Sequence, residues 1–241
     1  MKAIFITART KSSRLPRKCL LNIMHDKRTI EFLVERLLGL HVPVFLCTST
    51  SVEDDELAGV VARYGVKVFR GSEEDKLRRW LECARENNVD FFVTADGDDL
   101  FVEPTLIGMA LEQYDKHKHG FIHCTTTPTG SFSWGIETDS LERIYNKNVK
   151  EGMNTEMGFC WFDDVHELDN VPEEYLRTDI RMTLDYPEDL EFFKAVAEKI
   201  GNQPLQTILL FLDSNKDIIK LNWFREDDWR SNQKTLVEKI K

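Results

Sequence analysis

Long apolar segments are missing from this sequence of 241 residues. No apolar run approaches the roughly 18 residues that a membrane-spanning helix needs. The N-terminus also lacks the basic and then apolar order of a signal peptide, because it passes directly into a short apolar run. We therefore expect a cytoplasmic protein that does not insert into a membrane.

Cysteine is scarce, and basic residues are fewer than acidic ones. These two features disfavour disulfide- or zinc-stabilised proteins and nucleic-acid-binding proteins, respectively. The five cysteines are odd in number and scattered, and they include no C-x-x-C pair, which argues against a disulfide framework and against a structural zinc site. The six histidines show no metal-ligand spacing either. Lysine and arginine number 32 against 42 acidic residues, and the resulting net charge of −10 disfavours nucleic acid as a partner.

Two further absences concern the fold. No G-x-G-x-x-G motif follows the first apolar run, which disfavours a Rossmann dehydrogenase. No repeat, low-complexity linker or Gly/Ser-rich hinge divides the chain, so we predict one domain over residues 1–241. Residues 127–180 are long enough for an insertion that binds an acceptor or forms a homodimer, and the sequence assigns no structure within 146–180.

Short apolar runs alternate with helical patterns along the chain. The expected strands lie at 3–6, 42–48, 66–70, 91–95, 120–126, 135–138 and 181–185. The expected helices lie at 29–39, 53–64, 75–87, from near 103 onward, and at 187–200, 203–215 and 227–241. This order is typical of an α/β fold in which helices sandwich a mostly parallel sheet. We expect Trp223, Phe224 and Trp229 to pack as core residues.

A cationic loop follows the first expected strand. Five basic residues and no acidic residue lie between Arg9 and Lys18, and Pro16 prevents a regular helix there. The net charge is +7 over residues 1–28 and −17 over residues 29–241. In a parallel sheet this loop emerges at the carboxyl edge, where small ligands bind, so we expect it to hold an anion. The alternative is a solvated surface loop.

An acidic turn, Asp96-Gly97-Asp98-Asp99, follows the fourth expected strand. Three carboxylates in four residues repel one another unless a cation lies between them, and hard oxygen ligands suit Mg²⁺. The alternative is an exposed turn that caps the next helix. Asp185 closes the last expected strand, and helix capping does not account for it as it does for the acids that follow.

Three elements together resemble a known family. They are A-R-T-K-S-S-R-L-P-R-K-C-L at 8–20, A-D-G-D-D at 95–99 and R-M-T-L-D-Y-P-E-D-L at 181–190, with G-S-E-E-D at 71–75 and the set Pro128, Gly130 and Glu137 as further likenesses. The chain is similar over nearly its whole length to the cytidylyltransferases that include the 3-deoxy-manno-octulosonate and N-acylneuraminate enzymes. Its likeness is greatest to the spore-coat polysaccharide biosynthesis branch.

The resemblance implies a Rossmann-like nucleotidyltransferase fold that uses CTP and Mg²⁺, releases pyrophosphate and serves glycan synthesis. By position, the implied catalytic residues are Arg14, Lys18, Asp98 and Asp185, and the two aspartates among them are the implied metal ligands. The implied nucleotide-binding residues are Ala8, Arg9, Arg14, Lys18, Gly71, Ser72, Asp75, Asp96 and Gly97. The chain departs from the family pattern at Asp96, where a neutral residue is frequent, and at Leu100, where proline is common.

The acceptor is the least constrained part of the interpretation. We expect an anionic acceptor, namely an acidic nonulosonic sugar, a phosphosugar or a phosphonate. Glu137, Glu156 and Arg181 are candidate acceptor-binding residues, and each also fits a structural or surface role. Two alternatives stay open: a guanylyl- or uridylyltransferase that acts on a phosphosugar, and a nucleotide-binding relative without catalysis.

Overall fold

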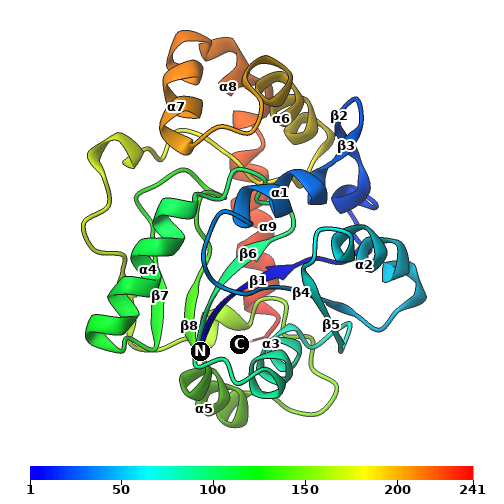
Figure 1. Cartoon of the computed structure of the whole chain (residues 1–241), viewed down its shortest axis with the longest axis vertical. Coiled ribbons are helices and arrows are strands. Elements are labelled where there is room, and N and C mark those ends of the chain that lie inside the picture. The colour runs from blue at the N-terminus through cyan, green and yellow to red at the C-terminus, as the bar shows by residue number, and fades with distance from the viewer. Residues whose placement is uncertain (241) are drawn as a thin grey trace.

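A seven-stranded sheet in the order β5-β4-β1-β6-β8-β7-β9 forms the centre of the molecule (Figure 1). The structure is a computed structural model and describes residues 1–240. The strands are β1 Lys2–Thr7, β4 Val44–Ser49, β5 Lys67–Gly71, β6 Phe91–Asp96, β7 Phe121–His123, β8 Gly135–Glu137 and β9 Val165–Glu167. The pairs among β5, β4, β1 and β6 are parallel, as is β7 with β9, while β8 is antiparallel to both its neighbours. The predicted mostly parallel α/β fold is confirmed.

Helices cover both faces of this sheet. They are α1 Thr29–Leu37, α2 Asp55–Ala62, α3 Lys76–Glu86, α4 Pro104–His117, α5 Thr138–Asn148, α6 Pro187–Ile200, α7 Leu205–Ser214, α8 Lys216–Trp223 and α9 Glu226–Glu238. Figure 1 shows α6, α7 and α8 together at one end of the molecule and α3 and α5 towards the other. The strands that alternate with α1, α2 and α3 are parallel. Each of these helices carries the chain back across the sheet, so that the next strand begins at the same edge as the one before it.

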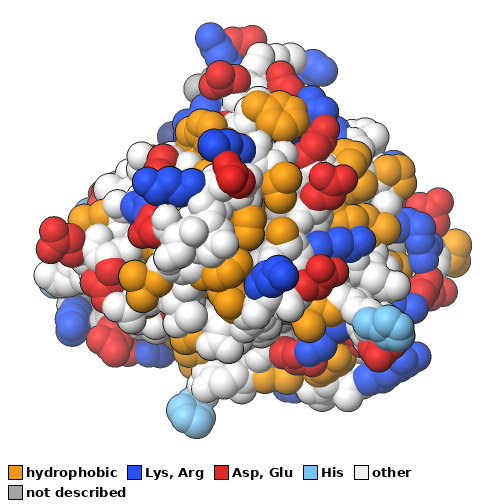
Figure 2. Space-filling model, turned by 90° about the horizontal axis from the view of Figure 1, so that it is seen from above, with side chains coloured by type: hydrophobic (Ala, Val, Ile, Leu, Met, Phe, Trp, Pro, Cys, Tyr) orange, Lys and Arg blue, Asp and Glu red, His pale blue; other side chains and the backbone are white. Residues whose placement is uncertain are grey.

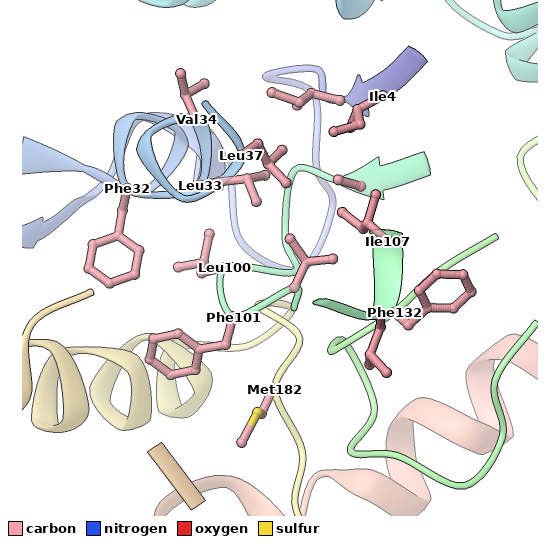
Figure 3. Packing of buried hydrophobic residues seen from close by; sticks show 14 of the residues in the cluster. Ile4, Phe32, Leu33, Val34, Leu37, Leu100, Phe101, Ile107, Phe132 and Met182 are labelled. Atoms are coloured by element: carbon pink, nitrogen blue, oxygen red, sulfur yellow. The ribbon is translucent and has the colours of Figure 1, made fainter. Parts of the chain in front are cut away.

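The alternation of side chains along β1 separates two apolar layers. Ile4 and Ile6 face a cluster that includes α1, α2, α4, α6 and α7, whereas Ala3 and Phe5 face a second cluster built with α3 and α5. Figure 3 shows the first cluster, where Leu100 lies beneath α1 and the ring of Phe101 points towards α6 and packs against Phe193. Leu100 is fully buried. The leucine that replaces the frequent proline therefore serves packing.

Three expectations about the chain are corrected by the structure. Residues 181–185 form no strand of the sheet but an extended segment, bridged at Arg181 to Thr129. A short hairpin of β2 Asn22–Met24 and β3 Lys27–Arg28 was not expected, and neither was α8. Trp223 and Phe224 are not core residues, because they are 38% and 58% exposed. Figure 2 shows one face of the molecule, on which apolar side chains lie among charged ones of both signs.

Residues 127–180 contribute β8 and β9 to the main sheet and α5 to one of its faces. Their predicted role as an acceptor-binding or dimerisation insertion stays a prediction. Within residues 1–240, none of the helices has the length and apolar character required to span a membrane.

Candidate functional site

The ends of β1 and β6 bring the cationic loop and the acidic turn together. These strands are parallel neighbours, and Thr7 at the end of β1 is in register with Asp96 at the end of β6. Gly97 follows at once, and a Cβ there would lie 2.6 Å from the Cβ of Ala8, so only glycine permits this approach of the two loops. The backbone N–H of Gly97 donates to the carbonyl of Thr7 at 2.8 Å. Ala8 and Gly97 thus set the spacing of the site.

The cationic loop folds back on itself and places Lys18 over the sheet edge. The N–H of Arg17 donates to the carbonyl of Thr10 at 3.0 Å, and Arg17 has a left-handed backbone (φ 56°) just before the short 3-10 helix Lys18–Leu20. Cys19 is buried beneath the loop, with its Sγ near the carbonyl oxygens of Arg9 and Gly97. A buried Cys19 turns its neighbour Lys18 towards the acidic turn.

Lys18 bridges the two aspartates that the sequence places 87 positions apart. Its Nζ donates to Asp98 Oδ2 at 2.5 Å and to Asp185 Oδ1 at 3.1 Å. Arg14 donates to the same Oδ1 of Asp185. Burial alone would lower the pKa of Lys18, but the charges of Asp98 and Asp185 outweigh it and raise that pKa above its ordinary value. All four predicted catalytic side chains therefore meet at one place.

Asp185 reaches this place on the extended segment 181–185. The N–H of Leu184 donates to the carbonyl of Asp98 at 2.9 Å, which ties the segment to the acidic turn. Burial would raise the pKa of Asp185, but the charges of Lys18, Arg14 and Arg181 lower it to about 2. The carboxylate is thus ionised across the physiological pH range.

The acidic turn concentrates three carboxylates in a small volume. Carboxylate oxygens of Asp96, Asp98 and Asp99 all lie within 4.8 Å of one another. Burial and the charge of Asp98 raise the pKa of Asp96 to about 6 despite nearby Lys76, and burial with Asp98 and Asp96 raises the pKa of Asp99 well above its usual range. Such crowding favours a bound cation, and the all-oxygen donor set fits Mg²⁺. The predicted metal ligand Asp98 belongs to this group.

A second cationic group lies beside Asp96. Arg9 donates to Glu156 Oε2 at 3.0 Å and to the carbonyl of Glu73 at 2.9 Å, while Lys76 donates to Glu156 Oε1 at 3.3 Å. The charges of Lys76 and Arg9 overcome burial and lower the pKa of Glu156 to about 2. The sequence predicts that Arg9 binds the nucleotide and Glu156 the acceptor, and in the structure these two side chains bind each other.

Comparisons with known proteins place the chain in a family. The cytidylyltransferase family model matches residues 3–212. The chain belongs to the cytidylyltransferase family. It is 30% identical over 232 residues to an uncharacterized protein of Methanocaldococcus jannaschii, an alignment that covers 92% of this chain and 95% of that protein.

A further relative and a solved structure are also similar to this chain. Spore coat polysaccharide biosynthesis protein SpsF of Bacillus subtilis is 26% identical over 226 residues, which cover 88% of this chain and 94% of that protein. A solved cytidylyltransferase structure from Leptospira borgpetersenii superposes with a TM-score of 0.77 at 24% identity, covering 90% of this chain and 96% of the other. The expected nucleotidyltransferase fold is confirmed.

The segment 71–75 also emerges at the carboxyl edge of the sheet. Gly71 ends β5 in register with Ser49 at the end of β4. Asp75 caps α3 by accepting from the N–H of Arg78 at 3.0 Å, and it accepts from Tyr145 Oη and Thr155 Oγ1, both at 2.7 Å. Ser72 offers its carbonyl oxygen to Arg79. The structure thus gives Asp75 a structural role and leaves the nucleotide-binding role of these residues a prediction.

Two predicted acceptor-binding residues do not lie at the site surface. Glu137 pairs with Phe91, the first residue of β6, so it lies at the opposite edge of the sheet and binds Tyr114 and Ser140. The sequence predicts the strand that carries Glu137 but not its direction, and β8 is antiparallel to both its neighbours. Arg181 is 0% exposed and cannot contact an acceptor, because its guanidinium lies behind Asp185.

Two residues of this site were not predicted. Lys76 neutralises Glu156 beside Asp96, and Asp99 completes the acidic group. Asp99 stood in the quoted turn, so the crowding of three carboxylates was already a signal for it. Lys76 carried no comparable signal, because a lysine in the first turn of a helix is ordinary on an exposed face.

Proposed function

We propose that this protein transfers CMP from CTP to an anionic acceptor and releases pyrophosphate in a Mg²⁺-dependent reaction. The observation that carries the proposal is the meeting of Arg14 and Lys18 with Asp98 and Asp185 at the carboxyl edge of the sheet. A pure nucleotide binder needs the cations but no second carboxylate. The joint presence of both kinds of group favours catalysis.

The cations of the first loop fit the phosphates of CTP. Arg14 carries a planar fork of donors, and its Nε is buried without a hydrogen-bond partner among the described residues. This free donor suits a phosphate oxygen, and Lys18 adds a compact charge next to it. In the protein alone the two side chains neutralise Asp98 and Asp185, and the phosphates of CTP would replace these carboxylates as their partners.

Asp98 and Asp185, with Asp96 beside them, would hold the Mg²⁺. Their oxygens fit a hard divalent cation, because the three carboxylates of the acidic turn crowd together and Asp185 shares Lys18 with Asp98. The bound ion would neutralise charge on the phosphate oxygens during the transfer. The backbone of the acidic turn orients these ligands, together with the hydrogen bond from the N–H of Leu184 to the carbonyl of Asp98.

The reaction brings an anion to an anion, so neutralisation and positioning dominate its catalysis. An oxygen of the acceptor attacks the α-phosphorus of CTP in line and forms a new P–O bond. The bond from the α-phosphorus to the bridging oxygen breaks, and pyrophosphate leaves with that electron pair. Arg14 and Lys18 stabilise the charge that develops on the leaving group.

The acceptor class rests on the relatives and on the charge of the site. One relative is named for spore coat polysaccharide biosynthesis. A 3-deoxy-manno-octulosonate cytidylyltransferase of Chlorobium limicola is 32% identical over 114 residues, which cover 46% of this chain and 44% of that enzyme. We assign Lys76, which pairs with Glu156 beside Asp96, to an acceptor carboxylate or phosphate, while Arg9 keeps its predicted contact with the nucleotide.

The test is pyrophosphate release with each of the four ribonucleoside triphosphates, against a panel of nonulosonic acids, phosphosugars and phosphonates. We expect release with CTP and one acidic acceptor, and none when the acceptor is omitted. Release with GTP or UTP and a phosphosugar would identify a guanylyl- or uridylyltransferase instead of an enzyme that transfers CMP. Tight CTP binding without release across the whole panel would identify a non-catalytic relative and refute the proposal.

A further inference from the structure

A buried ionic network connects Asp185 to the C-terminal helices. Its centre is the guanidinium of Arg181, which is 0% exposed. Arg181 Nη2 donates to Asp185 Oδ2 at 3.1 Å and to Asp189 Oδ2 at 3.1 Å, and Nε donates to Asp189 Oδ1 at 3.0 Å. Nη1 donates to Glu226 Oε2, in the first turn of α9, at 3.3 Å. Every nitrogen of the guanidinium therefore has a carboxylate partner.

The network fixes the backbone of Asp185 as well as its side chain. Asp189 Oδ2 accepts from the N–H of Asp185 at 2.8 Å and from that of Tyr186 at 2.9 Å. Asn222 of α8, also buried, donates through Nδ2 to Asp189 Oδ1 at 2.9 Å and to the carbonyl of Arg181 at 3.1 Å. The orientation of Asp185 is thus determined from behind by groups of α6, α8 and α9.

The two oxygens of Asp185 serve different partners. Oδ2 faces Arg181 inside the protein, whereas Oδ1 faces Lys18 and Arg14 at the site. A guanidinium held by one carboxylate alone would draw electron density from it and weaken it as a ligand. Asp189 and Glu226 share the charge of Arg181, so the guanidinium does not pair with Asp185 alone and Oδ1 stays turned towards the site.

From these contacts we infer that Arg181, Asp189 and Glu226 act as positioning residues for Asp185, so that the C-terminal helices α8 and α9 complete the site. The inference rests on the proposed function. It also goes beyond the family match, which ends at residue 212, before α8 begins at Lys216. The segment after residue 212 therefore acts on the reaction without contacting the substrates.

The first experiment compares Glu226→Gln with Glu238→Gln, which removes the same charge from the exposed end of the same helix. Binding of Mn²⁺, as a probe for Mg²⁺, is measured by the loss of the free-ion electron paramagnetic resonance signal. We expect about 10-fold weaker Mn²⁺ binding in Glu226→Gln and none of this loss in Glu238→Gln. The half-saturating Mg²⁺ concentration for turnover should rise in parallel, while the KM for CTP changes less.

Circular dichroism melting curves accompany both variants. If Glu226→Gln binds Mn²⁺ with wild-type affinity, the inference is wrong, and a lowered melting temperature in that case would show that the network is only structural. If Glu226→Gln does not fold, a second measurement on the unaltered protein decides the question.

That measurement is hydrogen exchange with and without CTP and Mg²⁺. Because coupling between two places is reciprocal, ligands that engage Asp185 should slow amide exchange in 226–238 as well as in 9–18. Slower exchange in 9–18 with unchanged exchange in 226–238 would overturn the positioning role and leave the proposed function intact. Unchanged exchange in both segments would contradict the proposed function itself, and this inference with it.

Discussion

At the scale of single residues, the site depends on a lysine that neutralises two acids. Lys18 is mostly buried and contacts both Asp98 and Asp185, whereas Lys11 of the same loop is 61% exposed and pairs with Glu73 at the surface. A buried cation between two carboxylates interacts with them more strongly than the two members of an exposed ion pair interact, because solvent screens the exposed pair. The two lysines therefore form a matched pair for substitution.

Replacing Lys18 by methionine should lower the rate of pyrophosphate release by about 10- to 150-fold. The estimate takes one lost charge-assisted contact to phosphate at roughly 1.5–3 kcal/mol, with about 1.4 kcal/mol for each tenfold change in rate. Lys11→Met is the control, and its rate should stay within about twofold of the wild-type rate. Equal effects of the two substitutions would show that loop charge, and not the position of Lys18, matters.

Gly97 provides a prediction about stability. In Gly97→Ala the new methyl group would lie 2.6 Å from Ala8 Cβ, so the loops must separate, and we expect a loss of about 1–3 kcal/mol in the free energy of unfolding. Gly59→Ala in α2 is the control, since no atom lies within 4 Å of its added Cβ. It should gain about 0.5–1 kcal/mol from helix propensity. Urea unfolding measures both values, and an unchanged Gly97→Ala would refute the steric argument.

At the scale of elements, sequence and structure agree where the pattern is local. The strands at 3–6, 42–48, 66–70 and 91–95 were found to within two residues, because buried parallel strands are short apolar runs between helices with clear ends. The proximity of the cationic loop and the acidic turn followed from that order, since the parallel strands before Arg14 and Asp98 end at the same edge, whereas the catalytic roles came from the family resemblance.

Other elements depend on contacts that the sequence does not display. The position of Glu137 was misjudged because the direction of β8 is set by pairing with β6 and β7, which are distant in sequence. Residues 181–185 alternate like a strand, yet they bond to Thr129 and to the turn at Asp98 instead of the sheet. Arg181 was taken for a ligand-binding residue because a lone arginine in a motif does not reveal that three carboxylates enclose it.

One buried acid, Asp54, holds the cationic loop against the end of β4. Asp54 accepts from the N–H and Oγ1 of Thr10, both at 2.7 Å, and from the hydroxyls of Ser49 and Thr48 at 2.5 and 3.0 Å. Burial opposes ionisation of Asp54, but these hydrogen bonds outweigh it and lower its pKa below the ordinary value. Asp54 therefore anchors the cationic loop to the end of β4.

This anchor predicts a pH dependence of stability. Because the folded pKa is lower than the unfolded value of about 3.9, the unfolded chain binds the proton more readily, and the stabilisation is present above that value and lost as the pH falls through the folded pKa. Asp54→Asn should cost about 1–3 kcal/mol in urea unfolding at pH 7 and clearly less at pH 3. Asp26→Asn, at an exposed position, is the control and should leave the free energy of unfolding unchanged at both pH values. A cost for Asp54→Asn that is equal at both pH values would contradict the assignment.

At the scale of the whole molecule, the charge is divided between the beginning of the chain and the rest. Residues 1–28 carry +7 and the remainder −17, and the positive part is folded onto acids of α2, the acidic turn and the 181–185 segment. A ligand that bears both a polyanion and a divalent cation matches this division. Neither an extended nucleic acid nor a bare cation does so equally well.

This division predicts selective stabilisation by the complete ligand. CTP with Mg²⁺ at about 100 times its dissociation constant should add about 2.7 kcal/mol and raise the melting temperature by about 5–10 °C. A thermal scan with CTP, UTP, GTP and ATP, each with Mg²⁺ or with a chelator, measures this. We expect the largest shift with CTP and a clear reduction by the chelator. Shifts of equal size with all four nucleotides would mean that the base is not recognised.

The sharing of Lys18 between Asp98 and Asp185 has a consequence for the order of events in solution. In the resting protein each of these groups already has a partner, so under the proposed function an incoming ion would meet occupied ligands and an incoming nucleotide would meet occupied donors. Whichever arrives first releases the groups that the other requires. Ion and nucleotide should therefore bind with mutual reinforcement, and titrations of either one alone should report weaker affinity than titrations of the two together.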